Sequence, residues 1–240
     1  MNLMPPPFLL YHKLDKPPRD ALVRGGYTPP ARFNRQIKFL KRQGFVFHTA
    51  SELVKHFRQH GEFPPKGIAL TFDDGWRDNY ENAFPILRRH GVTATIFLVA
   101  SCIGEVSRKA QAEGESERAH LLPEQILEMS KAGIEFGSHS LNHKLLDEIP
   151  LTEAEHEVAE SKGRIESLLQ QPCKVFAYPA GRYTEEVKAA VSRAGYDAAF
   201  AVTTGPTDPL DLYALNRVEI QRRDFFTLQF ARKVRLLRQA

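Results

Sequence analysis

Short apolar runs alternate along this chain with longer stretches in which hydrophobic residues recur every three or four positions. The first pattern is typical of buried strands and the second of amphipathic helices. In residues 32–43, for example, Phe33, Ile37 and Leu40 share one helical face, and Gly44 ends the helix. The predicted strands are residues 8–12, 45–48, 67–72, 93–99, 134–136, 175–178, 196–202 and 215–220. The predicted helices are residues 32–43, 52–60, 79–90, 123–132, 152–169 and 184–194, with a last one beginning at Asp224.

Strands followed by helices in this rhythm favour βαβ units and a mostly parallel sheet. About seven such units without a linker favour one (β/α) barrel domain over residues 1–240. Ser51 is the predicted cap of the second helix, and Thr152 with Glu155 forms a predicted capping box in the fifth. In a (β/α) barrel the functional residues follow the C-terminal ends of the strands, so reactive side chains should cluster there.

Two adjacent carboxylates, Asp73 and Asp74, follow the predicted strand at residues 67–72 and precede Gly75. Neighbouring side chains on a regular strand point to opposite faces. Both carboxylates can serve one site only if the backbone turns there, and Asp-Gly is a turn signal. A polar turn with solvated carboxylates is the simpler interpretation of this segment taken alone.

His139 and His143 follow the predicted strand at residues 134–136. On a helical turn this spacing would place both imidazoles on one face, where they could bind one metal ion. A pair of surface or capping histidines is an equally open interpretation of the motif alone. Together with one carboxylate, however, the two histidines would supply the three ligands of a hydrolytic zinc site.

Two more strand ends carry candidate residues. His12 is the last residue of the first predicted strand. The alternative interpretation is a histidine near the core whose hydrogen bonds are made within the protein. Pro179 and Gly181 favour a tight turn around Ala180, which could present backbone N–H groups to an oxyanion. An ordinary turn between strand and helix is the alternative there.

Bulk composition narrows the function classes. Hydrophobic residues make up 42% of the 240 residues, as is ordinary for a globular protein. The formal net charge of +4 is too small to indicate a nucleic-acid partner. Cys102 and Cys173 suggest no disulfide framework. The N-terminus lacks a signal-peptide pattern, and no segment approaches the roughly 20 apolar residues of a membrane span, so a cytoplasmic protein is expected. The sequence indicates no particular oligomeric state.

The chain resembles the polysaccharide deacetylase family, also called the NodB-homology family or carbohydrate esterase family 4. The matching motifs, which fall in order within about residues 66–220, are Thr71-Phe72-Asp73-Asp74-Gly75, His139-Ser140-Leu141-Asn142-His143 and Pro179-Ala180-Gly181. The resemblance implies a deformed (β/α)7 barrel and metal-dependent removal of an N-acetyl group from an N-acetylated glycan.

The resemblance also implies roles for single residues. Asp74, His139 and His143 would bind a divalent metal, with Zn²⁺ expected first and Co²⁺ or Ni²⁺ as alternatives. Asp73 would be the base that deprotonates the attacking water, and the Ala180 backbone N–H would help to hold the oxyanion.

Two departures from the family pattern bear on these roles. The family's third motif usually begins with an arginine that braces the base, but Ala177 stands there, which leaves open whether Arg182 substitutes. The usual final Leu-x-His, which supplies the catalytic acid, is here Leu215-Asn216-Arg217. One branch, similar to the poly-N-acetylglucosamine deacetylases of bacterial biofilm systems, carries an N-terminal Tyr-His whose histidine takes over the acid role. His12 fits that pattern, and Tyr178 belongs to the Ala-Tyr-Pro-x-Gly form of this branch.

Other functions compete with this assignment. A glycoside hydrolase needs two carboxylates about 5–9.5 Å apart, which adjacent aspartates are poorly placed to provide. Two other functions stay open as alternatives. One is a catalytically silent barrel that binds sugar, and the other is a deacylase that acts on another amide. The C-terminal helix is expected to close the barrel. The alternative is a more specific function, in which its basic face contacts an anionic membrane. The basic residues of this helix are Arg232, Lys233, Arg235 and Arg238, beside the apolar Phe226, Phe230, Val234 and Leu237.

Overall fold

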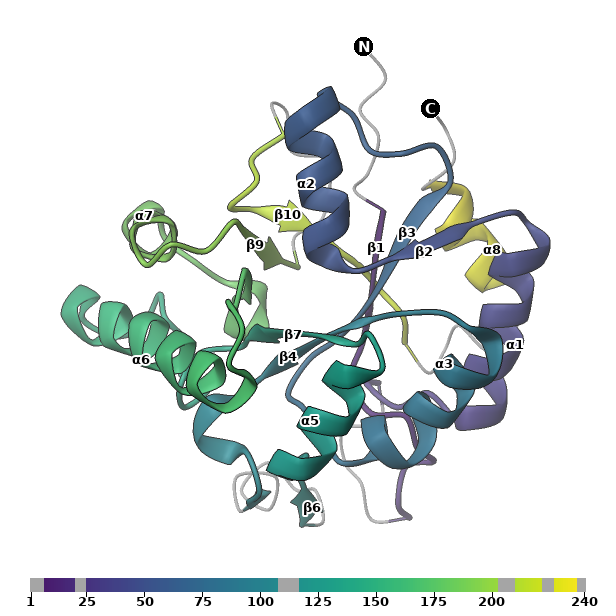
Figure 1. The fold of residues 1–240 in the computed structure, drawn as a ribbon, viewed down its shortest axis with the longest axis horizontal. Helices are drawn as coiled ribbons and strands as arrows, with labels where there is room; N and C mark the ends of the chain where they lie inside the picture. The colour runs from purple at the N-terminus through teal and green to yellow at the C-terminus, as the bar shows by residue number, and fades with distance from the viewer. Residues whose placement is uncertain (1–6, 20–24, 108–116, 203–209, 222–226, 237–240) are drawn as a thin grey trace.

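A computed structural model describes residues 7–19, 25–107, 117–202, 210–221 and 227–236. Short strands gather at the centre of the molecule and helices surround them (Figure 1). The barrel strands are β1 (Phe8–Tyr11), β2 (Val46–His48), β3 (Gly67–Phe72), β4 (Thr95–Leu98), β7 (Glu135–Ser138), β8 (Val175–Ala177), β9 (Ala198–Ala201), β10 (Leu215–Asn216) and β11 (Val218–Glu219). A separate antiparallel pair consists of β5 (Val106–Ser107) and β6 (Arg118–Ala119).

The helices follow the strands in the expected alternation. They are α1 (Pro30–Arg42), α2 (Ala50–His60), α3 (Phe84–His90), α5 (Pro123–Lys131), α6 (Leu151–Leu169), α7 (Glu185–Arg193) and α8 (Thr227–Leu236). A π-helical turn, η1 (Asn79–Ala83), leads into α3, and two 3₁₀ turns, η2 (Ala100–Cys102) and η3 (Pro179–Gly181), follow β4 and β8.

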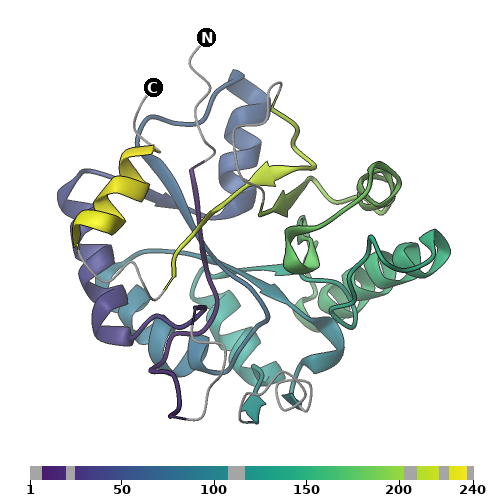
Figure 2. The ribbon, with the colours of Figure 1, turned by 180° about the vertical axis from the view of Figure 1, so that it is seen from behind.

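The parallel sheet closes on itself through one short segment of the chain. Its strand order is β10-β9-β8-β7-β4-β3-β1-β11, and β2 pairs with the start of β3. Only Arg217 separates β10, which pairs with β9, from β11, which pairs with β1. Seen from behind, the N-terminal strand and the yellow-green C-terminal segment run together (Figure 2). The expected deformed (β/α)7 barrel is therefore confirmed, and the predicted strand at 215–220 is broken in two at Arg217.

Both faces of the strands are buried, which explains why the strands appear as continuous apolar runs. Alternate side chains such as Leu9 and Phe72 pack outward against the helices. The other set, including Phe8, Phe97 and Phe200, fills the barrel interior together with Leu53 of α2. Helix α2 thus plugs one end of the barrel and leaves the C-terminal ends of the strands for the site.

Two predicted helix caps are wrong. The capping box of α2 is formed by Thr49 and Glu52, so the helix is capped two residues before Ser51. Helix α6 begins at Leu151, directly after Pro150, so Thr152 lies inside the helix and cannot be its cap. The fixed φ of Pro150 already directs the chain into the helix at this point.

The C-terminal helix α8 packs its apolar face on the outer core of the barrel. Phe230 and Val234 are buried, and the Phe230 ring lies edge-on to Phe39 of α1. Arg232 is exposed, whereas Lys233 donates a hydrogen bond to the Glu219 carbonyl. Membrane contact through the basic face stays a prediction. The predicted helix start at Asp224 and the side chains of Phe226, Arg235, Leu237 and Arg238 lie outside the described residues. Within the described ranges, no helix is long and apolar enough to span a membrane.

Candidate metal and catalytic site

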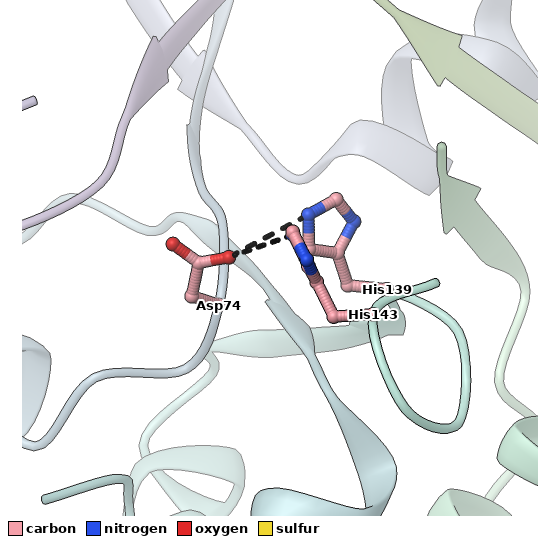
Figure 3. A group of neighbouring side chains, drawn as sticks. All are labelled: Asp74, His139 and His143. Carbon is pink, nitrogen blue, oxygen red and sulfur yellow. Dashed lines mark ion pairs between the residues drawn. The ribbon is translucent and has the colours of Figure 1, made fainter. Parts of the chain in front are cut away.

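Three potential metal ligands meet beyond the C-terminal ends of β3 and β7 (Figure 3). Asp74 Oδ1 lies 3.4 Å from His143 Nε2 and 3.7 Å from His139 Nε2. His139 is buried, whereas Asp74 and His143 are partly exposed, so the group is open to solvent on one side. The structure thus brings together the three residues for which the sequence predicts metal binding.

A backbone turn directs Asp73 and Asp74 toward the same site. Asp74 has a φ of 74°, in the left-handed region that side chains disfavour, and Gly75 follows with a φ of 68°. The positive φ favours glycine at position 75, where a Cβ would also come within 2.7 Å of the Leu98 side chain. Trp76 Nε1 donates a 2.8 Å hydrogen bond to Asp74 Oδ2, while Oδ1 faces the histidines.

The two histidines lie on a loop and not on the helical turn that the spacing suggested. Ser140 and His143 have φ values of 63° and 57°, which interrupt any helical path. The Ser140 hydroxyl accepts a 2.9 Å hydrogen bond from the His143 backbone N–H and closes the loop. Glu157 of α6 accepts two hydrogen bonds from Asn142, one from its backbone and one from its side chain. A hydrogen bond within the loop and two to Glu157 of α6 therefore hold both rings in place.

His139 is held in the neutral tautomer that a metal ligand needs. Its Nδ1 lies 2.7 Å from the Ala177 carbonyl oxygen, which can only accept, so Nδ1 carries the proton. Nε2 is then left with a lone pair that faces Asp74. Burial lowers the pKa of His139 to about 4 despite the nearby carboxylates, so the imidazole is neutral at physiological pH.

Arg217 pairs with Asp73 inside the barrel. The guanidinium donates two hydrogen bonds to the Asp73 carboxylate, at 2.6 and 2.7 Å. It lies over the rings of Phe97 and Phe200, in the apolar interior. Burial alone would raise the pKa of Asp73, but Arg217, helped by the His139 and His12 imidazoles, lowers it. Asp73 is therefore ionised and can accept a proton.

Arg217 is the functional residue that sequence reasoning missed. In the sequence it stands out only as the residue that replaces a histidine in the final motif. No signal in the sequence pointed to it, because the predicted strand at residues 215–220 runs through Arg217 and the strand-end rule applies only to residues that follow a strand. The question left open for Arg182 is settled by its own contacts: it bonds Asp147 and Glu148 on the surface and does not brace the base.

The turn after β8 contains two further predicted residues. Ala180 adopts a left-handed φ of 54° and is exposed. The turn's backbone hydrogen bonds come from the N–H groups of Gly181 and Arg182 and do not use that of Ala180. The buried Tyr178 packs with the outer core, and its hydroxyl donates to the Tyr213 carbonyl. Tyr178 supports the turn from behind and does not face the carboxylates.

His12 lies at the end of β1, close enough to influence both carboxylates. Its imidazole lowers the pKa of Asp73 and that of Asp74. Asn79 anchors the residue by donating to the His12 carbonyl. Within the described part of the chain, the buried His12 Nδ1 has no hydrogen-bond partner. The neighbouring ends of β1 and β3 thus bring His12 and Asp73 into the same cluster.

The ligand set fits a divalent metal such as zinc. Two ligands bound to a tetrahedral zinc at about 2.0–2.1 Å lie roughly 3.3–3.4 Å apart. The separations of 3.4 and 3.7 Å from Asp74 Oδ1 to the two histidines are close to that value. Two imidazoles and one carboxylate also leave positions for water and substrate.

Comparisons with known proteins identify the family that the chain resembles. The polysaccharide deacetylase family matches residues 60–199. YxkH of Bacillus subtilis, whose name assigns it to the polysaccharide deacetylases, is 31% identical over 217 residues, or 89% of this chain and 71% of that protein. A poly-β-1,6-N-acetyl-D-glucosamine N-deacetylase of Staphylococcus epidermidis is 26% identical over 208 residues, or 82% of this chain and 68% of the relative.

Solved structures show the same fold. The deacetylase PplD of Streptococcus pyogenes, in complex with acetate, aligns with a TM-score of 0.77 at 27% identity over 90% of this chain and 92% of that one. IcaB from Ammonifex degensii has a TM-score of 0.77 at 21% identity, over 97% of this chain and 96% of that chain.

The chain therefore belongs to the polysaccharide deacetylase family, as the motifs had indicated. It is a hydrolase of the class that acts on carbon–nitrogen bonds other than peptide bonds. The family is generally metal-dependent, and the group of Asp74, His139 and His143 is a candidate metal site.

Proposed function

We propose that this protein removes N-acetyl groups from an N-acetylglucosamine-containing oligo- or polysaccharide and releases acetate. The observation that carries the proposal is the ionised Asp73 directly beside the candidate metal ligands Asp74, His139 and His143. A relative that acts on poly-β-1,6-N-acetyl-D-glucosamine supports that polymer as the first substrate to test.

Asp74, His139 and His143 would hold the metal ion, for which Zn²⁺ is the first candidate. When bound, the ion supplies Lewis-acid chemistry: it polarises the amide carbonyl and lowers the pKa of water. The neutral imidazole of His139 and the low pKa of Asp74, which His143 and the other imidazoles hold down against burial, keep these ligands ready to bind.

The remaining residues would handle the protons and the developing charge. Asp73, held in place by Arg217, takes a proton from the attacking water. The Ala180 N–H stabilises the oxyanion by donating a hydrogen bond. His12 delivers a proton to the amine nitrogen, which is otherwise a poor leaving group. With Arg217 in the final motif paired to Asp73, the acid has to come from another strand end, and His12, directly after β1, is the available imidazole.

Acetate release tests this proposal directly. Purified protein is incubated with β-1,6-linked N-acetylglucosamine oligomers, with added Zn²⁺ or with chelator, and acetate is measured. Release that the chelator abolishes and Zn²⁺ restores is expected, and Asp74→Ala should release none.

A catalytically silent sugar-binding barrel is the second candidate, favoured by the arginine in place of the final-motif histidine. Oligomer binding without acetate release under any metal condition would support it. Release of acyl groups from non-sugar amides alone would keep the chemistry and change the substrate class.

A further inference from the structure

The returning end of the polar segment at residues 101–120 packs on the loop that carries Asp74. Trp76 and His120 form an antiparallel bridge. On one side of it the Arg77 N–H donates to the Ala119 carbonyl, and on the other the Leu121 N–H donates to the Gly75 carbonyl, both at 2.9 Å. This segment, residues 118–121, therefore holds the loop along its whole length.

His120 acts on the backbone of Asp74. Its Nδ1 donates a 3.0 Å hydrogen bond to the Asp74 carbonyl oxygen, because a carbonyl can only accept. Asp74 has the disfavoured φ of 74°, so this hydrogen bond fixes a peptide that a relaxed loop would rotate. The buried His120 ring stacks on Trp76 with 4.3 Å between ring centroids.

Trp76 acts on the side chain of Asp74. Its indole N–H donates to Oδ2 at 2.8 Å, which leaves Oδ1 facing His139 and His143. The indole cannot swing away, because it is only 7% exposed and the Lys13 ammonium lies 5.1 Å from its ring centroid. The carboxylate is thus aimed by one aromatic residue and its peptide is fixed by the other.

We propose that Trp76 and His120 are positioning residues that set the affinity of the site for its metal ion. The inference rests on the proposed function in that it takes Asp74 as a metal ligand. Partners that orient metal ligands typically account for 10–100-fold in metal affinity.

A purely structural role for His120 is the alternative, and one feature of the residue speaks against it. Its buried Nε2 has no hydrogen-bond partner within the described ranges. A phenylalanine would fill the same stack without leaving a polar atom unpaired. Packing alone would therefore favour phenylalanine, whereas the hydrogen bond to Asp74 requires histidine.

The test compares Trp76→Phe and His120→Phe, which keep the stacked rings and remove one hydrogen bond each. The dissociation constant for Zn²⁺ is measured by competition with a chromophoric chelator, and the melting temperature is measured on metal-free protein. Each variant should bind Zn²⁺ about 10–100-fold more weakly, with a metal-free melting temperature unchanged or higher for His120→Phe. His120→Asn places an amide N–H near the lost Nδ1, so its affinity should recover toward wild type even if its stability falls.

Two controls separate this inference from the proposed function. Tyr80→Phe removes an aromatic residue's hydrogen bond to Glu128, outside the site, and should leave the affinity unchanged. If Asp74→Ala abolishes binding while Trp76→Phe and His120→Phe bind like wild type, the inference is wrong and the metal site stands. If Asp74→Ala binds like wild type, the metal site itself is wrong. Weaker binding that only follows a lower metal-free melting temperature, without rescue by His120→Asn, would also overturn the inference.

Discussion

Each end of the barrel contains a carboxylate, buried for Asp73 and half-buried for Glu135, and the two are held by different partners. At the end covered by α2, Glu135 Oε2 accepts hydrogen bonds from Thr95 Oγ1 at 2.7 Å and from the Ser51 N–H at 3.2 Å. At the open end, Asp73 accepts two hydrogen bonds from the Arg217 guanidinium. The first carboxylate has neutral donors and the second has a cation.

The pKa values of the two groups move in opposite directions. Burial raises the pKa of Glu135, and its neutral donors offset this only in part. Burial acts on Asp73 in the same sense, but the Arg217 charge outweighs it and the pKa falls. A full positive charge in the interior is costly, so its presence beside Asp73 marks the end of the barrel where an ionised carboxylate is needed.

The backbone differs between the two ends as well. Four of the described non-glycine residues with positive φ, namely Asp74, Ser140, His143 and Ala180, lie in loops at the open end. Such conformations cost free energy and persist where the surroundings hold them. Conformational strain and ionised groups therefore occur at the same end of the barrel. Variants of the two carboxylates and of their partners test this difference between the two ends.

The largest effect is expected for Asp73→Asn. An asparagine cannot accept the proton from water, so kcat should fall by about 10²–10⁴-fold, the range of general base catalysis. Acetate release under saturating substrate measures it. Zn²⁺ affinity, measured in the same preparation, should change little, because Asp74 and the two histidines are retained.

A variant Asp73→Asn that deacetylates at the wild-type rate would remove Asp73 from the mechanism. The barrel's open end would then hold a structural ion pair, and the contrast with Glu135 would lose its functional meaning.

Arg217→Met should have the next largest effect. Removing one partner of a buried ion pair leaves the other charge uncompensated, which typically costs about 3–5 kcal/mol of stability. Without the guanidinium, burial dominates and the pKa of Asp73 should rise. The base then loses its charge at a higher pH, so the acidic limb of the kcat profile should move upward in pH.

Arg217→Lys is the matched control, because it keeps the charge and loses the two-pronged geometry. Denaturant unfolding and the pH profile should both place it between wild type and Arg217→Met. An acidic limb that stays in place in Arg217→Met would show that Arg217 does not set the protonation of Asp73.

His12→Ala is expected to reduce kcat by roughly 10²-fold, the lower range for a missing general acid. The three candidate metal ligands are untouched, so Zn²⁺ affinity should be retained. Substrates with an activated leaving group, such as anilides, need less help from an acid and should lose less activity. Unchanged acetate release in His12→Ala would contradict the acid assignment.

The fold could be predicted from the sequence because its strands are local patterns. The run from Gly67 to Phe72 matches β3 residue for residue. The closure at Arg217 could not be predicted, since it depends on one short segment pairing with β9 and β1 at once. The displaced caps of α2 and α6 are single-residue choices that Pro150 and the Thr49–Glu52 pair decide locally.

The candidate site shows the same limit. The sequence motifs predicted the candidate ligands together with Asp73, because the strand-end rule places them on one edge of the sheet. The partners of these residues were not predictable, since Arg217 reaches Asp73 from a position 144 residues away. Likewise, nothing in the local sequence connects His120 with the peptide of Asp74.

The smallest effect is expected at the closed end, for Glu135→Gln. The Thr95 hydroxyl and the Ser51 N–H both donate to Oε2, so the glutamine carbonyl oxygen can take its place and keep these two donors. Because the pKa of Glu135 is raised in the folded protein, folding favours the protonated form of this carboxyl. The stability that results is fully present below the unfolded-state pKa and is lost as pH rises through the folded-state pKa. At pH 7–8 the variant should therefore be more stable than the wild type, because the neutral amide carries no charge to desolvate. Thermal melts across pH should show this gain shrinking toward pH 4, where Glu135 is protonated as well, with activity unchanged.

A variant that is less stable at pH 8 would mean that the α2 end also holds an ionised carboxylate, and the two ends of the barrel would then be alike in charge.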